Sequence, residues 1–413
     1  MKITIRDIEK AAENIGDSVE KTPLQFSQRL SNLYSAKIYL KREDLQKVRS
    51  FKIRGALNKI INLTNTQKNA GIVTASAGNH AQGVAFACNK LKIKGTIFMP
   101  RLTPNQKVER VKYFGNGHVT VMLEGENYDE SCALAKKHSH DKKASYIPAF
   151  DDKDVIAGQA TVGKEILEQN GNIDYVLAGV GGGGLVAGIA EFIKAKSPNT
   201  KIIGVESDGT ASMTLSLKKG KITSLKSVDT FCDGIAVKTV GKLTFEIFKK
   251  LNLDMVVIPE GKVAEVMIEL FQNDGIIAEP AGALPIAALD SIAKKIKGKT
   301  VVCVVSGGNN DLLRYPEILE KSLVYQGRKH YFLIDFAQKP GQLKNFVNHV
   351  LGPTDDIALF EYTKKNNKEK GPALVGIELK DKKDLPRLLS QMQNYGFHYK
   401  MIEDKDLLYS YLV

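Results

Sequence analysis

Residues 175–190 read YVLAGVGGGGLVAGIA: an apolar run of strand length, four consecutive glycines, and an apolar run with helical spacing. Consecutive glycines are entropically costly inside a folded core. A flexible linker would be flanked by polar residues, whereas these glycines lie between two apolar runs. A row of backbone N–H groups that binds a phosphate explains both flanks. The run lacks the GxxxxGK[ST] pattern, which disfavours a nucleoside triphosphate as the ligand.

The alternation of strand and helix continues on both sides of this segment. Short apolar runs predict buried strands and longer amphipathic runs predict helices. Their alternation over about residues 10–320 is typical of parallel α/β sheets. The predicted strands are 72–75, 95–99, 118–122, 175–178, 202–205 and 300–305, and the predicted helices include 81–92, 157–169, 185–195 and 263–273.

Two further turns follow predicted strands, where ligands bind in open parallel sheets. In the turn 76–80, small side chains leave backbone amides exposed at a helix start, which suits a carboxylate. Asn79 adds a donor within reach of a phenolic oxygen. In the second turn, Ser306 precedes two glycines and offers a neutral hydroxyl to a pyridine nitrogen. The alternative for both segments is a tight turn without a ligand.

Lys52 lies between the apolar residues Phe51 and Ile53. A desolvated amine loses its proton more readily, and a Schiff base requires a neutral amine. A lone lysine near a helix start is usually exposed, so Lys52 gains its significance only from this setting. One lysine, one asparagine, one glycine loop and one serine are together able to hold an aromatic aldehyde phosphate. The sequence therefore predicts a pyridoxal-phosphate enzyme.

These elements, in this order, resemble the tryptophan-synthase-β-like family (fold type II) of pyridoxal-phosphate enzymes. Within that family the chain is similar to the threonine dehydratases of the biosynthetic kind, over about residues 5–320. The resemblance rests on the sequence segments Leu40–Gln46, Ser50–Ala56, Ser76–Gly83, Met99-Pro100 with Thr103-Pro104, and Asp233–Val237.

The resemblance implies a Schiff base of pyridoxal 5'-phosphate on Lys52, with Phe51 stacked near the ring. It implies that Asn79 contacts the ring oxygen and that Ser306 lies at the pyridine nitrogen. The implied reaction is β-elimination from L-threonine, which gives 2-oxobutanoate and ammonia, with L-serine as a slower substrate. The phosphate would lie on Gly181, Gly182, Gly183, Gly184 and Leu185, and the substrate carboxylate on Ser76, Ala77, Gly78, Asn79 and His80.

The C-terminal residues follow a different pattern. Predicted strands at 330–337, 357–363, 373–379 and near the C-terminus alternate with helices at 341–350 and 383–394, and a polar turn lies at 364–370. This βαββαβ order is ferredoxin-like. It resembles the ACT-like regulatory domain of the same enzymes, which implies isoleucine as an effector. An exposed sheet edge in so small a domain also predicts a homo-oligomer, a dimer or a tetramer.

We therefore expect an α/β protein with two domains. A catalytic domain over 1–325 would contain two parallel-sheet subdomains, the smaller one inserted over roughly 70–148. An ACT-like domain would follow over 326–413.

The chain departs from the related serine racemases at two places. Ala77 stands where they carry a second serine that acts as an acid–base group. Glu206 keeps the first acidic position of their cation site, but Ser212 stands at the later one. We therefore expect poor racemisation and no bound metal.

Composition and charge narrow the classes of function that remain. The formal charge is +13, but the lysines are dispersed and no aromatic-interleaved basic stripe is present, so we expect no nucleic-acid partner. No export signal or membrane span is evident, and the four cysteines are scattered, so we expect a cytoplasmic enzyme without membrane contact. Two alternatives remain: a catabolic serine/threonine dehydratase and a non-catalytic amino-acid sensor.

Overall fold

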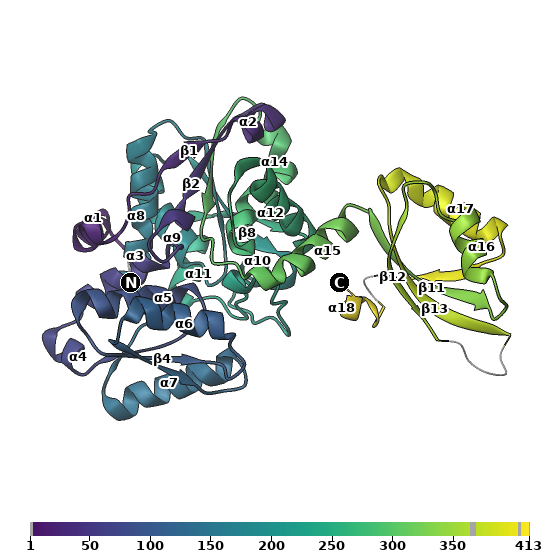
Figure 1. Cartoon of the computed structure of the whole chain (residues 1–413). Coiled ribbons are helices and arrows are strands. Elements are labelled where there is room, and N and C mark those ends of the chain that lie inside the picture. The colour runs from purple at the N-terminus through teal and green to yellow at the C-terminus, as the bar shows by residue number, and fades with distance from the viewer. Residues whose placement is uncertain (1–2, 364–368, 404–405, 413) are drawn as a thin grey trace. The chain divides into compact units, whose positions relative to one another are not determined.

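The computed structural model describes residues 3–363, 369–403 and 406–412. The chain divides into two compact units, residues 1–260 with 270–310 and residues 261–269 with 311–413 (Figure 1). Within the described ranges, no helix combines the length and the apolar character needed to cross a bilayer. The predicted fold class is confirmed, with two parallel-sheet α/β layers in the first unit and an antiparallel sheet in the second.

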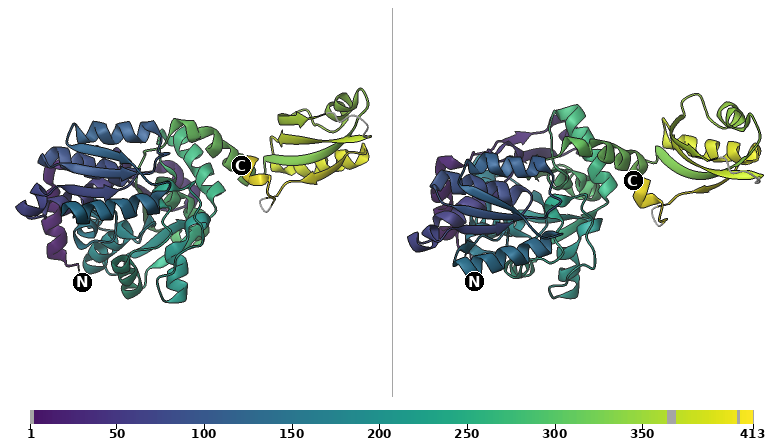
Figure 2. Two further views of the ribbon diagram at one scale, coloured as in Figure 1. Left: turned by 90° about the horizontal axis from the view of Figure 1, so that it is seen from below. Right: turned by 60° about the horizontal axis from the view of Figure 1, so that its bottom comes forward.

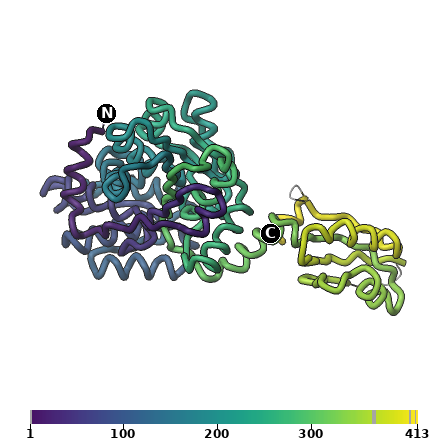
Figure 3. Tube along the Cα trace, turned by 90° about the horizontal axis from the view of Figure 1, so that it is seen from above, coloured from purple at the N-terminus to yellow at the C-terminus, as the bar shows by residue number. Residues whose placement is uncertain are grey.

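The larger sheet of the first unit has the strand order β1-β2-β10-β7-β8-β9, and only the β1–β2 pair is antiparallel. Its central strands are buried on both faces, which explains their continuous apolar sequences. The N-terminal strand β2 lies beside β10, which is about 260 residues later in the chain (Figure 3). The strands are β1 (Leu24–Phe26), β2 (Lys37–Arg42), β7 (Tyr175–Gly179), β8 (Lys201–Ser207), β9 (Asp254–Ile258) and β10 (Thr300–Val305).

The smaller sheet is parallel throughout, with the strand order β5-β4-β3-β6. Helices α5 and α6 cover one face and α7 covers the other (Figure 1). These segments gather as one lobe, coloured blue in Figure 2. The elements are β3 (Ile72–Ala75), α5 (Asn79–Leu91), β4 (Gly95–Met99), α6 (Asn105–Gly115), β5 (Val119–Leu123), α7 (Tyr128–Lys142) and β6 (Ser145–Tyr146).

Several other helices complete the first unit. The three that matter most for the site are α3, α8 and α9, because α3 packs between α5 and α8, and α8 packs on α9. Helix α12 contributes residues to both units. The bounds are α1 (Ile5–Ile15), α2 (Gln28–Tyr34), α3 (Lys52–Ile61), α4 (Asn65–Asn69), α8 (Lys153–Gln169), α9 (Gly184–Lys196), α10 (Ser212–Lys219), α11 (Lys242–Leu251), α12 (Glu260–Asp274), α13 (Pro280–Ala287) and α14 (Leu289–Ile296).

The second unit contains an antiparallel sheet of order β12-β13-β11-β14. Phe332, Ile334 and Phe336 alternate along β11 and share one core with Phe346 of α16 and Met392 of α17, so both helices pack on the same face. This is the predicted βαββαβ arrangement. The elements are α15 (Tyr315–Tyr325), β11 (Lys329–Ala337), α16 (Gln342–His349), β12 (Asp356–Tyr362), β13 (Lys370–Glu378), α17 (Leu385–Asn394), β14 (His398–Met401) and α18 (Tyr409–Leu412).

Of the predicted polar turn at 364–370, residues 364–368 lie outside the described part of the chain. The domain boundaries at 325 and at 70–148 stay predictions.

Candidate active site

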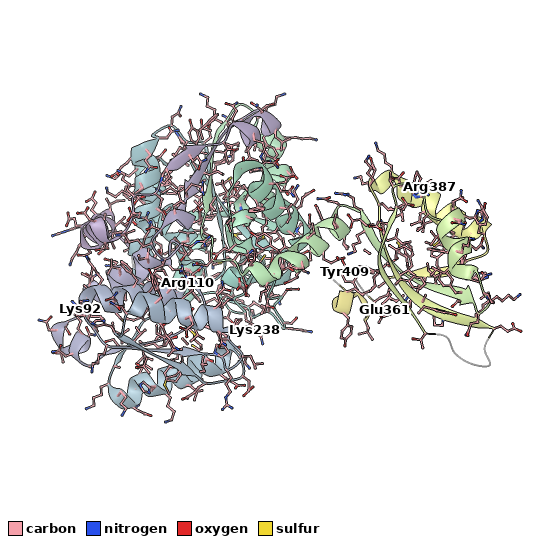
Figure 4. The ribbon with its side chains drawn as sticks, in the orientation of Figure 1. Lys92, Arg110, Lys238, Glu361, Arg387 and Tyr409 are labelled. Atoms are coloured by element: carbon pink, nitrogen blue, oxygen red, sulfur yellow. The ribbon has the colours of Figure 1, made fainter. Side chains whose placement is uncertain are left out.

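A cavity of about 770 Å³ lies in the first unit, at the ends of β3, β7 and β10. The turns after β7 and β10 meet here because parallel strands place their carboxyl ends at one edge of the larger sheet, and the smaller sheet contributes the turn after β3 to the same cavity. Lys238, labelled in Figure 4, also lines this cavity. Every residue predicted to bind the cofactor or the substrate contributes to the lining, namely Phe51, Lys52, Ser76, Ala77, Gly78, Asn79, His80, Gly181, Gly182, Gly183, Gly184, Leu185 and Ser306.

Lys52 is the first residue of α3. Its Nζ atom donates to the carbonyl oxygen of Ala149 at 3.0 Å and lies 5.4 Å from the centroid of the Phe51 ring. Burial lowers the pKa of Lys52 to about 8, against the opposing charge of Glu279. A buried amine with this pKa is partly neutral near neutral pH, as a nucleophilic lysine requires.

Close helix packing fixes the position of Lys52. A Cβ atom at Gly83 of α5 would lie 3.1 Å from the Lys52 carbonyl group, and one at Gly158 of α8 would lie 2.7 Å from the Arg54 carbonyl oxygen. The Arg54 guanidinium is fully buried and pairs with Glu43 at 2.8 Å and with Glu165 at 2.6 Å. Helix α3 is therefore held by backbone contact on two sides and by a buried ion network.

The turn 76–80 leads directly into α5, whose first residue is Asn79. The side chain of Ser76 accepts from the backbone N–H of Gly78 at 3.2 Å. The Nε2 atom of His80 donates to the carbonyl oxygen of Ile147 at 3.0 Å, and burial lowers the pKa of His80 to about 3. His80 is thus a neutral side chain that ties the turn to the segment after β6.

The glycine loop forms a cradle that side chains would fill. A Cβ atom at Gly182 would lie 2.2 Å from the Phe150 ring, and one at Gly181 would lie 2.9 Å from the Cα atom of Ile235. Gly183 has a φ of +90°, which disfavours other residues. Helix α9 begins at Gly184, so its unpaired N–H groups and its dipole favour an anion here.

Glu279 also lines the cavity, and the sequence analysis missed it. It is buried, and burial raises its pKa to about 7. The Nδ2 atom of Asn79 lies 2.8 and 2.9 Å from its two carboxylate oxygens. The available signal was a single acidic residue inside the apolar run 276–289, immediately before Pro280.

Two glutamines were missed as well. Gln82 of α5 and Gln159 of α8 line the cavity, and the side-chain oxygen of each is buried without a hydrogen-bond partner. Buried polar atoms without partners usually meet a ligand or a water molecule. These two amides indicate that the cavity binds a ligand or water molecules with polar groups.

Comparison with known proteins agrees with this geometry. Residues 15–307 match the family model described as pyridoxal-phosphate dependent enzyme, and residues 320–412 match the C-terminal regulatory domain of threonine dehydratase. The chain belongs to the pyridoxal-phosphate-dependent enzymes. Within them it belongs to the family of the biosynthetic L-threonine dehydratases, as the full-length relatives show.

One such relative, the biosynthetic L-threonine dehydratase of Halalkalibacterium halodurans, is 51% identical over 413 residues, with 100% of both chains covered. The enzyme of the same name from Bacillus subtilis is 49% identical and covers 98% of this chain and 97% of its own.

Solved structures extend the comparison. The processed form of threonine deaminase isoform 2 from Solanum lycopersicum is 40% identical with a TM-score of 0.73, covering 77% of this chain and 94% of its own. Maize serine racemase is 32% identical with a TM-score of 0.72, covering 79% of this chain and 99% of its own.

Pyridoxal phosphate, the cofactor of this family, fits the residues present. The glycine cradle would hold the phosphate, and the Lys52 amine is buried and partly neutral. The side-chain oxygens of Gln82 and Gln159, which have no hydrogen-bond partner, belong to residues that line the same cavity and are able to accept from a polar ligand. The separate role of each lining residue stays a prediction.

Glu206 already has partners in this threonine dehydratase homologue. Its carboxylate accepts from the backbone N–H groups of Met213 and Thr214 at 2.7 and 2.9 Å and thereby binds the start of α10. The hydroxyl oxygen of Ser212 is buried without a partner.

Proposed function

We propose that this enzyme removes water and then ammonia from L-threonine and releases 2-oxobutanoate. The observation that carries the proposal is the buried amine of Lys52 in a cavity with a phosphate cradle, in a chain that matches biosynthetic L-threonine dehydratases over its full length. Biosynthetic threonine deamination is the first committed step toward isoleucine.

Bound pyridoxal phosphate supplies an aldehyde that captures amino groups and a conjugated system that accepts the electrons of the Cα–H bond. Lys52 would hold it covalently, with Phe51 against the ring. The backbone of the glycine loop from Gly181 to Leu185 would bind its phosphate. Asn79 would donate to its ring oxygen, and the Ser306 hydroxyl would face its ring nitrogen.

Lys52 is also the base of the reaction. Its free Nζ atom would remove the proton from the substrate Cα atom. Burial keeps the pKa of this amine near 8, so the amine releases the proton again without a large cost. The carbonyl oxygen of Ala149, 3.0 Å away, accepts a hydrogen bond from Nζ in this position.

The turn 76–80 would bind the substrate carboxylate through its backbone N–H groups at the start of α5. The side chain of His80 is engaged with Ile147, so we assign the carboxylate contact to the backbone at this residue. Ala77 offers no hydroxyl opposite Lys52. Elimination is therefore favoured over racemisation.

The substrate is selected by a single methyl group. One methyl in an apolar pocket is worth about 1–3 kcal/mol, so L-serine should react more slowly than L-threonine. The domain over 326–413 would bind isoleucine and lower the activity, and the enzyme would work as a cytoplasmic homo-oligomer.

The test is the stoichiometry of the reaction. Purified enzyme with pyridoxal phosphate and L-threonine should release 2-oxobutanoate and ammonia in equal amounts, and Lys52→Ala should lose this turnover. A Lys52→Ala enzyme with native turnover would end the proposal.

A further inference from the structure

The carboxyl group of Glu279 occupies a space that glycines leave open. A Cβ atom at Gly307 would lie 2.5 Å from Oε1 of Glu279, and one at Gly234 would lie 3.4 Å from the same atom. The carboxyl group therefore lies between the turn after β10 and the first residue of α5. There it accepts from the Nδ2 atom of Asn79 with both oxygens and from the backbone N–H of Asn309.

The amide of Asn79 is fixed from its other end as well. The Nδ2 atom of Asn309 donates to the Oδ1 atom of Asn79 at 2.8 Å and to the carbonyl oxygen of Val48 at 2.7 Å. An amide nitrogen only donates, and the ionised carboxylate of Glu279, the form present above its pKa of about 7, only accepts. In that form the two neighbours of Asn79 dictate opposite ends of its amide.

A reversed Asn79 amide would be costly. Its oxygen would face the Glu279 carboxylate, and its nitrogen would face the nitrogen of Asn309. Each mismatch leaves polar groups unpaired, among them the buried Glu279 carboxylate, and a buried group without a partner keeps the full cost of its desolvation. The orientation of Asn79 thus depends on Glu279 and Asn309 together.

We propose that Glu279 and Asn309 are positioning residues that keep the amide nitrogen of Asn79, and not its oxygen, available to the ring oxygen of the cofactor. This inference rests on the proposed function, in which Asn79 contacts that atom. A donor at this place stabilises the ionised ring oxygen, whereas an amide oxygen would repel it.

The main test is Glu279→Gln. This substitution keeps the shape of the side chain and replaces one accepting oxygen with a donating NH2 group. The readout is the absorption spectrum of the bound cofactor, whose bands report whether the ring oxygen is ionised. We expect the ratio of ionised to neutral bands to fall severalfold. We also expect cofactor affinity to fall about three- to tenfold, the usual effect of one hydrogen bond.

Asn309→Asp tests the same amide from the other end. The substitution puts an accepting carboxylate oxygen where the Oδ1 atom of Asn79 needs a donor. It should therefore shift the spectrum in the same direction as Glu279→Gln. It also provides the test if the Glu279→Gln protein does not fold. The matched control is Glu206→Gln, which removes a buried carboxyl that does not line the cavity. Its spectrum should equal the native one.

The outcomes separate the two proposals. A native protein that stays colourless with pyridoxal phosphate would refute the proposed function. A coloured native protein whose spectrum is unchanged in both Glu279→Gln and Asn309→Asp would refute the positioning role alone. An equal shift in the Glu206→Gln control would also refute it, because the change would then follow from the loss of any buried carboxyl.

Discussion

At the scale of single residues, the proposed chemistry depends on the amine of Lys52. Burial lowers its pKa from 10.5 to about 8. About one amine in ten is then neutral at pH 7, against about one in three thousand for an unperturbed lysine. Capture of an aldehyde requires the neutral amine.

We therefore predict that cofactor-free protein binds pyridoxal phosphate about five times faster at pH 8 than at pH 7, because the neutral fraction rises by that factor. The rate should level off above about pH 9, and the appearance of colour after mixing measures it. A rate that keeps rising tenfold per pH unit toward pH 10.5 would show that burial does not shift this amine.

The glycine cradle gives a second prediction. In Gly182→Ala the new methyl group would lie 2.2 Å from the Phe150 ring, so the loop or this ring must move. We expect cofactor affinity to fall about tenfold or more, roughly 1.4 kcal/mol, in an equilibrium titration. The control is Gly171→Ala, whose added carbon would lie 3.9 Å from its nearest neighbour and should leave the affinity unchanged.

Sequence identified the residues of this site unevenly. Lys52, Asn79 and Ser306 were predictable because each stands in a short motif beside glycines or after a strand. Glu279 was not, because its importance comes from its contact with Asn79, which is 200 residues earlier in the chain. The same holds for Gln159, whose neighbours in the sequence gave no indication of a cavity.

At the scale of elements, α3 carries Lys52 and is anchored by buried charge. Arg54 pairs with both Glu43 and Glu165, and removal of the guanidinium would take its ion pair from the buried Glu43 carboxylate, while Glu165 would keep its pair with Lys41. Breaking a buried pair from one side typically costs about 3–5 kcal/mol.

Arg54→Met should therefore lower the free energy of unfolding of the cofactor-free protein by about 3–5 kcal/mol, as measured by urea denaturation. Lys21→Met is the control, because the ion pair of Lys21 with Glu168 is exposed and should contribute nothing measurable. A loss in Arg54→Met no larger than in this control would contradict the anchoring role.

The strands show where sequence patterns succeed. Strands β3, β4, β7, β8 and β10 were predictable because burial on both faces makes them continuously apolar. Strands β1 and β6 have three and two residues, which is too short for a strand pattern of apolar residues to be recognised in the sequence. Strand β2 is polar at its C-terminal end, where Lys41 pairs with the distant Glu165 and Arg42 pairs with the nearby Asp44.

At the scale of the whole molecule, the cavity and the core of the C-terminal sheet are formed by separate residues. The described residues that line the cavity all belong to 1–260 and 270–310, and the core of the C-terminal sheet is formed by residues after 330.

Truncation after residue 325 should therefore leave turnover of L-threonine within about twofold of native while abolishing the response to isoleucine, because the cavity keeps all of its lining residues. Turnover of L-threonine at increasing isoleucine concentrations measures both the basal activity and the response to isoleucine. An inhibition curve that survives the truncation would place the effector site outside the C-terminal domain.

The most direct measurement is the rate of 2-oxobutanoate release from L-threonine by the purified full-length enzyme with pyridoxal phosphate, with and without isoleucine. We predict turnover that falls as isoleucine rises, together with slower turnover of L-serine. A protein that binds the cofactor and turns yellow, yet forms no 2-oxobutanoate from L-threonine, would contradict the proposed function.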